Sequence, residues 1–402
     1  MNNNLSVNEQ LQILKQGVEK ILPENGLKEK LELNRPLRIK LGFDPTRPDL
    51  HIGHAVVLRK LRQFQDLGHK IVVVIGDFTA TIGDPSGKKS MRPPLTKAEV
   101  EINAKTYCDQ LNIILDVEKA EVAYNSQWLA RLSLAEIIQL TGKVTVAQIL
   151  AREDFHLRYQ QGNPIGIHEL LYPLLQAYDS IAIKADVEMG GTDQTFNLLL
   201  GRELQPLYGQ APQILVLMAI LEGLDGVQKM SKSLDNYVGL TDKPEDMYGK
   251  IMSITDDLMI KYWNLCSDLP LEELKQLITS IKDSSYHPRD AKMQLAYNIV
   301  KQYHGNENAK KSQEEFVKMF QKKEIPDDIP TYPYQGQTAK IVDLMTNSAL
   351  ASSKSEARRL IQQGGVKWDN NIVKDVNFEV NVCVNGTILQ VGKRKFMKVT
   401  RI

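Results

Sequence analysis

A strand, a helix and a second strand follow one another closely near the start of this 402-residue chain, and they constrain its fold more than any other feature. Segment 37–42 alternates and ends at Gly42, segment 50–68 has helical periodicity and also ends at a glycine, and segment 71–75 is a continuous β-branched run. A terminal glycine is a common helix stop, and an unbroken apolar run is typical of a buried parallel strand. The spacing predicts a βαβ unit and hence an α/β, doubly wound, Rossmann-like parallel sheet domain.

Further segments predict the organisation of the rest of the chain. Segment 5–33 has the pattern of an amphipathic helix with a break at 23–26, and strand-like pieces appear at 119–124, 180–185 and 213–217. Residues 243 to about 323 are almost wholly helical in pattern, and a proline-rich stretch follows. We therefore predict four parts: a catalytic domain at 1–240 with a connective insertion at about 115–190, a helical domain at 241–324, a linker at 325–338, and a small α+β domain at 339–402.

Charge is distributed unevenly along a chain whose net charge is only +1. From Ala339 to the end there are 11 Lys and Arg against 5 Asp and Glu, which leaves 39 against 44 before it. A basic tail on a mildly acidic body is typical of a terminal nucleic-acid module. The three cysteines are widely spaced in no CxxC pattern, and no apolar run is long enough to cross a bilayer. We expect no fixed protein-bound metal, no membrane association and a cytoplasmic location.

Two short motifs carry the strongest chemical signal. The first is His51-Ile52-Gly53-His54, which follows the segment from Gly42 to Thr46; the second is Lys229-Met230-Ser231-Lys232-Ser233. In this order they resemble the HIGH and KMSKS signatures of the class I aminoacyl-tRNA synthetases. A helix that starts at the carboxyl end of a strand offers amide donors to phosphate, and a loop with two lysines can stabilise the charge that develops on phosphate oxygens. Taken singly, each motif has a simpler interpretation, as a helix start with solvated histidines or as a solvated basic loop.

The amino-acid substrate is indicated by two other segments. Residues 168–179, His-Glu-Leu-Leu-Tyr-Pro-Leu-Leu-Gln-Ala-Tyr-Asp, and residues 190–194, Gly-Gly-Thr-Asp-Gln, resemble the tyrosyl-tRNA synthetases of bacteria. Tyr172, Gln176 and Asp179 have helical spacing and share one face. The resemblance covers nearly the whole chain, and it implies an enzyme that forms tyrosyl-adenylate from L-tyrosine and ATP and then transfers tyrosine to the 3′ end of tRNA(Tyr). This family is itself the known illustration of a site that rejects phenylalanine because it is built to bind a hydroxyl.

The resemblance assigns a role to each matching residue. It implies that Asp84, Tyr172 and Gln176 hold the α-ammonium group, that Asp179 accepts a hydrogen bond from the phenol hydroxyl, and that Gln194 helps to place the carboxylate. Asp44 would contact tyrosine and Thr46 phosphate. His51, Gly53, His54, Asp193, Lys229 and Lys232 would bind ATP. We also expect Lys88 and Arg92 near phosphate, although a purely structural turn remains an alternative for these two residues.

One position departs from the family pattern. Many bacterial members have a tyrosine two residues before the glycine of Gly-Phe-Asp, and this tyrosine shares the phenol hydroxyl. Here that position is Lys40, which suggests a second bacterial subgroup. Strand alternation places Lys40 on the same side as Gly42 and Asp44, where its ammonium could stay solvated or pair with a carboxylate. The replacement for the second hydroxyl contact is left open.

The basic tail contains a helix signal at 352–367, with a capping-box spacing from Ser353 to Glu356 and a glycine stop. It resembles the small RNA-binding domain that ends many bacterial tyrosyl enzymes. Such a domain would neutralise RNA phosphates, although a merely solvated basic face is the alternative. The candidate tRNA-binding residues are Lys354, Arg358, Arg359, Lys393, Arg394 and Lys395.

Two other functions remain open from the sequence. A tryptophanyl enzyme would share the ATP motifs, and an inactive relative would keep only RNA binding. The stripe from Gln176 to Asp179 favours tyrosine, and the intact motif histidines and lysines favour activity. By the resemblance we also expect Mg²⁺ to accompany ATP and the protein to be a homodimer.

Overall fold

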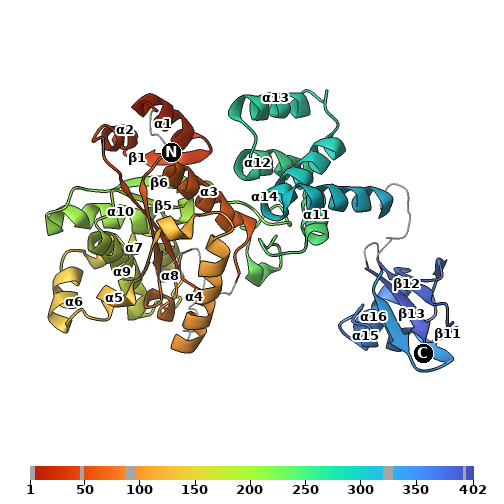
Figure 1. The fold of residues 1–402 in the computed structure, drawn as a ribbon. Coiled ribbons are helices and arrows are strands. Elements are labelled where there is room, and N and C mark those ends of the chain that lie inside the picture. The colour runs from red at the N-terminus through yellow and green to blue at the C-terminus, as the bar shows by residue number, and fades with distance from the viewer. Residues whose placement is uncertain (1–4, 46–48, 87–95, 320–328, 393–394) are drawn as a thin grey trace. The chain divides into compact units, whose positions relative to one another are not determined.

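In the computed structural model, a six-stranded sheet forms the centre of the catalytic part of the chain (Figure 1). The structure describes residues 5–45, 49–86, 96–319, 329–392 and 395–402. They divide into two compact units, Met1–Ala309 and Lys310–Ile402, which are described separately. The strands of the first sheet, in the order β1-β6-β5-β2-β3-β4, are β1 Val18–Leu22, β6 Ile214–Met218, β5 Val187–Gly191, β2 Arg38–Phe43, β3 Lys70–Ile75 and β4 Glu121–Tyr124.

Strand β2 lies at the point where the chain reverses its direction of travel across the sheet. It pairs in parallel with β3, with Phe43 opposite Ile75, and in parallel with β5, with Leu41 opposite Met189. The chain runs from β2 to β3 and β4 on one side, and then returns to β5 and β6 on the other. Ligands of doubly wound folds bind at such a switch point, at the carboxyl ends of the strands. The predicted α/β fold class is confirmed.

The helices of the first unit follow the predicted periodicity closely where it was clearest. Helix α3 begins at Ile52, ends at Asp66, and buries Leu58, Leu61 and Phe64 completely. Gly68 follows it at φ 86°, a conformation that suits glycine at a helix stop. The other helices before the second motif are α1 Val7–Lys15, α2 Gly26–Leu31, α4 Lys97–Leu111, α5 Ser126–Leu129, α6 Leu134–Thr141, α7 Val146–Leu150, α8 Glu153–Gln160, α9 Ile167–Ile183 and α10 Thr195–Leu204. Short 3₁₀ turns lie at Thr79–Thr81, Val117–Lys119, Thr192–Gln194, Gln205–Tyr208 and Lys232–Leu234.

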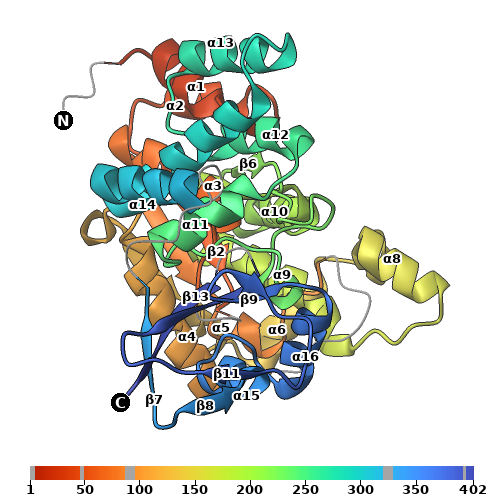
Figure 2. The same cartoon turned by 90° about the vertical axis from the view of Figure 1, so that its right-hand side faces the viewer.

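The described residues of the stretch predicted as helical, from 243 to about 323, form α11 Pro244–Met252, α12 Asp256–Cys266, α13 Leu271–Lys282 and α14 Pro288–Val317. Helix α14 is interrupted at Gly305, whose φ is 82°. Up to residue 309 these helices belong to the same compact unit as the sheet. In both views α11 to α13 lie apart from α6, which is at the far end of the sheet domain (Figures 1 and 2).

Two secondary-structure predictions for the first unit are wrong. Residues 18–22, predicted as helix, form β1, because they pair antiparallel with β6 from Val18–Met218 to Leu22–Leu215. Residues 180–185, predicted as a strand, instead complete α9 and its left-handed cap at Lys184. At this end of the helix Ile181, Ile183 and Ala185 are buried while Ala182 and Lys184 are exposed, an alternation that resembles the pattern of a strand.

The second unit is an α+β domain with a hydrophobic core of its own, as predicted. Its main sheet has the order β10-β9-β12-β13-β7, and the core includes Ile341, Leu344 and Leu389. The elements are β7 Thr331–Tyr334, β8 Thr338–Lys340, α15 Ile341–Asn347, α16 Lys354–Gln362, β9 Val366–Trp368, β10 Asn371–Ile372, β11 Glu379–Asn381, β12 Thr387–Val391 and β13 Lys395–Arg401. Strand β7 lies inside the stretch predicted as a linker, and its parallel pairing with β13 makes this part of the linker a strand of the domain.

Within the described ranges, no helix combines the length and the apolar character that crossing a membrane requires.

Candidate active site

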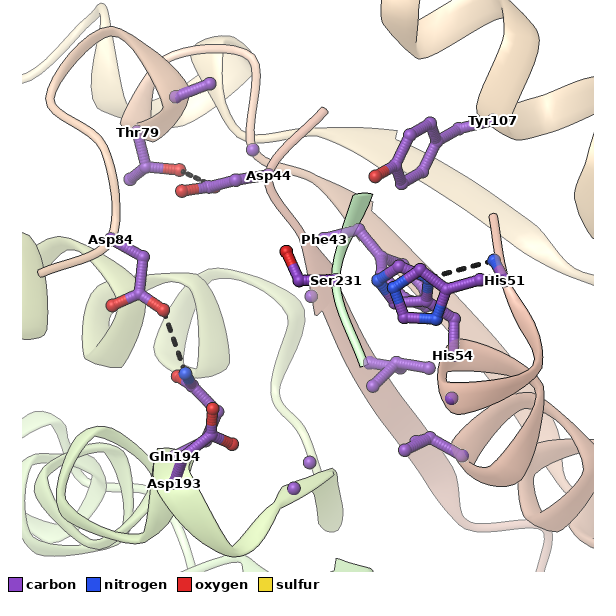
Figure 3. Close-up of a pocket in the computed structure, with 18 of the residues that line it drawn as sticks. Phe43, Asp44, His51, His54, Thr79, Asp84, Tyr107, Asp193, Gln194 and Ser231 are labelled. Carbon is purple, nitrogen blue, oxygen red and sulfur yellow. Dashed lines mark hydrogen bonds between the residues drawn. The ribbon is translucent and has the colours of Figure 1, made fainter. Parts of the chain in front are cut away.

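A cavity of about 800 Å³ lies at the carboxyl ends of β2, β3, β5 and β6. It brings together the first motif, the α9 stripe and the second motif, whose successive separations in the sequence are 118 and 50 positions. Among the residues that line it are all the described candidates for tyrosine and ATP: Asp44, His51, Gly53, His54, Asp84, Tyr172, Gln176, Asp179, Asp193, Gln194, Lys229 and Lys232. Figure 3 shows the carboxylates on one side of this cavity and the two histidines on the other.

Asp44 follows β2 and is held by two hydroxyl groups. Thr79 Oγ1 donates to Oδ1 at 2.8 Å, and Tyr172 OH donates to Oδ2 at 2.9 Å. Loss of solvation raises the pKa of Asp44 to about 7, and the charges of Asp84 and Asp179 add to this increase. Gly76 is required beside this group, because a Cβ there would lie 2.1 Å from Asp44 Oδ1.

Asp84 sits opposite, at the end of the loop after β3. Gln194 Nε2 donates to its Oδ2 at 2.9 Å, and Ser86 donates to its Oδ1 from both its amide and its hydroxyl (Figure 3). The buried Arg152 supports this group, since its Nη2 donates to Ser86 Oγ at 2.8 Å. Asp84 and Gln194 therefore face one part of the pocket as a single hydrogen-bonded unit.

His51 and His54 stack at the start of α3, with ring centroids 3.8 Å apart. Burial is the main cause that lowers both pKa values, to about 4 for His54 and well below the usual value for His51, and nearby Lys229 lowers them further. Both rings are therefore neutral at pH 7. The His51 amide donates to His54 Nδ1 at 3.3 Å, which leaves the proton of the neutral His54 ring on Nε2. Gly53 allows this packing, because a Cβ there would lie 3.0 Å from His51 Nδ1.

The second motif is paired with carboxylates of the same cavity. Lys229 Nζ lies 3.1 Å from Asp193 Oδ2, and Lys232 forms an ion pair with Asp49. The segment after the motif is hydrogen-bonded to the first motif, since the Ile52 amide donates to Val238 O at 3.0 Å. This backbone contact fixes one end of the lysine loop against the histidine helix.

Helix α9 presents its polar stripe to the pocket. Asp179 is buried and accepts from Trp128 Nε1 at 2.8 Å and from Asn125 Nδ2 at 3.2 Å. Burial raises the pKa of Asp179 to about 6, and the charge of Lys40 opposes that rise. Gln176 Oε1 is buried and has no hydrogen-bond partner among the described residues. An unpartnered acceptor in a pocket wall is suited to a cationic ligand group.

Lys40 does not stay solvated. Its side chain is fully buried, and Nζ lies 2.7 Å from Glu188 Oε1 on the neighbouring strand β5. Of the two alternatives for the Lys40 ammonium group, solvation or pairing with a carboxylate, the structure shows the pairing.

Comparison with known proteins identifies the family. Residues 32–321 match the family profile described as tRNA synthetases class I (W and Y), and residues 321–399 match the tyrosine–tRNA ligase SYY-like C-terminal domain. The chain is 54% identical to the tyrosine–tRNA ligase of Thermotoga maritima over 392 residues, which cover 98% of this chain and 97% of that protein. It is 52% identical to that of Moorella thermoacetica, over 97% and 95% of the two chains. The chain belongs to the tyrosine–tRNA ligase family.

Solved structures support the fold of this tyrosine–tRNA ligase family member. The tyrosyl-tRNA synthetase of Archaeoglobus fulgidus, complexed with L-tyrosine, has a TM-score of 0.62 at 23% identity and covers 77% of this chain and 100% of its own. A truncated mitochondrial tyrosyl-tRNA synthetase of Aspergillus nidulans has a TM-score of 0.64 at 21% identity, over 78% and 94%.

The remaining candidate residues either fall outside the described residues or belong to the second unit. Thr46, Lys88, Arg92, Lys393 and Arg394 fall outside the described residues. The other tRNA candidates belong to the second unit: Arg358 and Arg359 are exposed on α16, Lys354 pairs with Asp343 at 2.8 Å, and Lys395 donates to Leu350 O at 3.1 Å. Within the described ranges, no group of three or more His, Cys, Asp or Glu side chains is arranged to hold a metal ion.

The sequence analysis did not identify the residues that hold the candidate site residues in place. Asn125 follows β4 at the carboxyl edge of the sheet, a position that could have marked it, and Asp49 lies two residues before the first motif. Arg152 and Glu188 carry no such signal, because their partners come from distant parts of the chain.

The raised pKa of Asp44 predicts a pH-dependent stability cost. Between the ordinary aspartate value of about 3.9 and its own value of about 7, the folded state binds more protons at Asp44 than the unfolded state, so stability falls as pH rises through this window. We expect Asp44→Asn to remove this dependence. The gain in free energy of unfolding over the unsubstituted protein, measured in urea, should be larger at pH 8 than at pH 5 by about 2–3 kcal/mol.

The exposed Asp109 on α4 provides the control, since Asp109→Asn should show no pH-dependent gain. An equal gain for Asp44→Asn at both pH values would contradict the raised pKa.

Proposed function

We propose that this chain activates L-tyrosine with ATP and transfers it to tRNA(Tyr), and that the cavity at the switch point is the site of activation. The observation that carries this proposal is one cavity with two chemically different ends. Among the described residues, three carboxylates without a lysine partner and the Gln176 amide oxygen lie at one end, and two neutral histidines and two lysines, each lysine paired with a carboxylate, lie at the other. The first end suits an ammonium group and a phenol, and the second suits polyphosphate.

For tyrosine, we propose that Asp84, Tyr172 and Gln176 bind the α-ammonium group and that Asp44 contacts the same end of the substrate. Gln194 would place the carboxylate, and Asp179 would accept from the phenol hydroxyl. The buried position of Asp179, with two donors already holding it, supports a fixed acceptor. A phenylalanine ring would leave this carboxylate without its substrate partner, which is costly in a buried site.

For ATP, we propose that Asp193 binds the ribose and that the N–H groups of His51 and His54 contact phosphate. The tyrosine carboxylate attacks the α-phosphorus, a new P–O bond forms, and the bond to the leaving pyrophosphate breaks. Lys229 and Lys232 would then exchange their carboxylate partners for the charge that develops on the phosphates, which favours the transition state over the ground state. Mg²⁺ would enter with ATP and be held mainly through phosphate oxygens. Thr46, Lys88 and Arg92 remain candidates for phosphate contacts.

We further propose that the second unit binds tRNA(Tyr) and that the enzyme acts as a homodimer in the cytoplasm, where its substrates are found. Support for the dimer comes from exposed apolar side chains in the connective insertion. Of nineteen large exposed hydrophobic residues in the described part of the chain, six fall between positions 134 and 167: Leu134, Ile138, Val146, Leu157, Tyr159 and Ile167. Exposed apolar groups that are concentrated in one segment of the sequence favour an interaction surface there, and a second copy of this chain is the proposed partner.

Amino-acid-dependent pyrophosphate exchange tests the activity. We expect exchange driven by tyrosine and not by tryptophan, and we expect Asp179→Ala to lower kcat/KM for tyrosine by about 10- to 150-fold, the effect of losing one hydrogen bond to a charged group. The KM for ATP should change little. Lys229→Ala should show the reverse pattern, with a lower kcat and an unchanged KM for tyrosine. Exchange driven by tryptophan, or no exchange, would overturn the proposal.

Binding of a tRNA(Tyr) transcript tests the second unit. Arg358→Ala combined with Arg359→Ala should weaken binding at least tenfold and lower the slope of log affinity against log salt by about 1.5–2, because two phosphate contacts are lost. Tyrosine-dependent exchange should be unaffected. Lys340→Ala with Lys374→Ala removes the same charge from exposed positions of the same unit and serves as the control. Equal effects of the two pairs would show a general charge effect and not a contact at α16.

Sedimentation or light scattering tests the homodimer. The side chains of Leu134 and Ile138 lie one turn apart on α6, at 73% and 61% exposure. Two glutamates there should convert the dimer to a monomer, because they place charge in an apolar interface. Ile372→Glu with Val384→Glu adds the same charge at exposed apolar positions of the second unit and should leave a dimer. A monomeric unsubstituted protein would refute the interface.

A further inference from the structure

A buried ion pair lies behind the tyrosine end of the cavity. Lys40 on β2 and Glu188 on β5 have side chains that are 0% and 1% exposed, and Lys40 Nζ lies 2.7 Å from Glu188 Oε1. Removing two charges from water costs several kcal/mol per ion, so a buried pair is weak evidence for stability alone. Its position next to the substrate pocket calls for a role in the site.

All three protons of the Lys40 ammonium group have acceptors. In addition to Glu188, Nζ donates to Ser180 Oγ at 2.7 Å and to the backbone oxygen of Gln176 at 3.0 Å. An ammonium group has three donors and no acceptor, so none is left for a ligand. Lys40 therefore does not replace a direct contact with the substrate hydroxyl.

Two of these contacts hold helix α9 against the sheet. Gln176 and Ser180 lie one turn apart on α9, on either side of Asp179 in the sequence, and both are held by the same ammonium group. Ser180 Oγ in turn donates to Glu188 Oε2 at 2.8 Å, and Gln213 Nε2 also donates to that oxygen. The network joins β2, β5, α9 and the residue before β6, and it fixes the part of α9 that presents Gln176 and Asp179 to the pocket.

The same pair sets the charge of Asp179. Burial is the largest influence on this group and raises its pKa to about 6, while the positive charge of Lys40 is the largest opposing influence. Trp128 and Asn125 also oppose the rise through hydrogen bonds, and the charge of Glu188 adds to it by a smaller amount. The remaining titratable groups that interact with Asp179 are Asp44 and Tyr172, whose own pKa values it raises.

We propose that Lys40 is a positioning residue for tyrosine selection: paired with Glu188, it holds the α9 backbone at Gln176 and Ser180 and supplies the positive charge that keeps the buried Asp179 carboxylate ionised. An ionised carboxylate accepts a stronger hydrogen bond from a phenol than a protonated one does. This inference rests on the proposed function of the cavity, and it concerns a residue that does not touch the substrate.

The test is the selectivity for tyrosine over phenylalanine as a function of pH. The ratio of kcat/KM for the two amino acids in pyrophosphate exchange reports the contribution of Asp179, because only tyrosine has the hydroxyl that Asp179 would bind. Asp44 and the contacts to the α-ammonium group affect both substrates alike. In the unsubstituted enzyme the ratio should fall on acidification with a midpoint near pH 6. In the variant with Lys40→Met and Glu188→Gln, the midpoint should rise by about one unit, since the larger influence of Lys40 is lost. The ratio should then be about three- to fivefold lower between pH 6 and 6.5 and recover above pH 8.

Glu188→Gln alone should move the midpoint pH of the selectivity ratio in the opposite direction. It keeps the positive charge and an oxygen acceptor but removes the negative charge that raises the pKa of Asp179. Its midpoint should move below that of the unsubstituted enzyme. Lys40→Arg keeps the charge and should keep the midpoint, which makes it the rescue variant. A purely structural pair would lower activity in every variant without moving the midpoint in two directions.

A second buried pair, between α8 and the start of α9, serves as the matched control. Arg158 Nη1 lies 2.6 Å from Glu169 Oε2, with both side chains at most 5% exposed. Arg158→Met with Glu169→Gln removes equivalent charges from the start of α9 and should leave the selectivity midpoint in place. Thermal unfolding of each variant shows whether it is folded, and Glu188→Gln alone decides the question if the double variant is not.

The outcomes separate the two proposals. If the unsubstituted enzyme supports no tyrosine-dependent exchange, the proposed function fails. If exchange is normal but the midpoint is the same in all the variants, or moves equally in the Arg158 control, the role of Lys40 is refuted. Opposite shifts for the double variant and for Glu188→Gln establish it.

Discussion

The parallel pairing of β2 with both β3 and β5 is the constraint on which the site depends. In a parallel sheet the carboxyl ends of neighbouring strands lie at one edge, so residues that follow β2, β3 and β5 must meet there. Asp44 follows β2, Asp84 lies in the loop after β3, and Asp193 and Gln194 directly follow β5. Because β2 is the strand at which the chain changes direction, this edge is the switch point at which ligands of doubly wound folds bind.

This convergence brings several negative charges close together, and the remaining contacts of the site compensate part of their repulsion. Five aspartates line one cavity: Asp44, Asp49, Asp84, Asp179 and Asp193. Where lysines can reach, as at Asp49 and Asp193, the carboxylates are paired, and where they cannot, as at Asp44, the pKa rises to about 7. The buried Lys40 does not line the cavity, but its positive charge lowers the pKa of Asp179. The site thus holds more negative charge than its solvation favours, a condition that a cationic substrate group would relieve.

The two histidines of the first motif are neutral, and this state suits them to contact phosphate. A charged imidazole would compete with the lysines for phosphate and would be costly to bury, whereas a neutral ring donates one N–H at a fixed tautomer. Burial lowers the pKa values of both rings and so keeps them neutral, and the positive charge of Lys229 adds to this effect. The loop that carries Lys229 is in turn anchored to the start of α3 through Val238, so the two ATP motifs are parts of one structural unit.

The local sequence determined those features that depend on short-range chemistry. The βαβ unit, the glycine stop after α3, the shared face of Tyr172, Gln176 and Asp179, and the cap at Ser353 all follow from periodicity and side-chain type within a few residues. Tertiary structure decided what local patterns cannot encode. Residues 18–22 are a strand because they pair with β6. Residues 180–183 continue α9, where Ser180 contacts Lys40 and Glu188 from the sheet. Lys40 is buried because Glu188, almost 150 positions away, pairs with it on the next strand. A pattern in one segment reports the environment of that segment only, and these three outcomes depend on partners that folding brings from elsewhere.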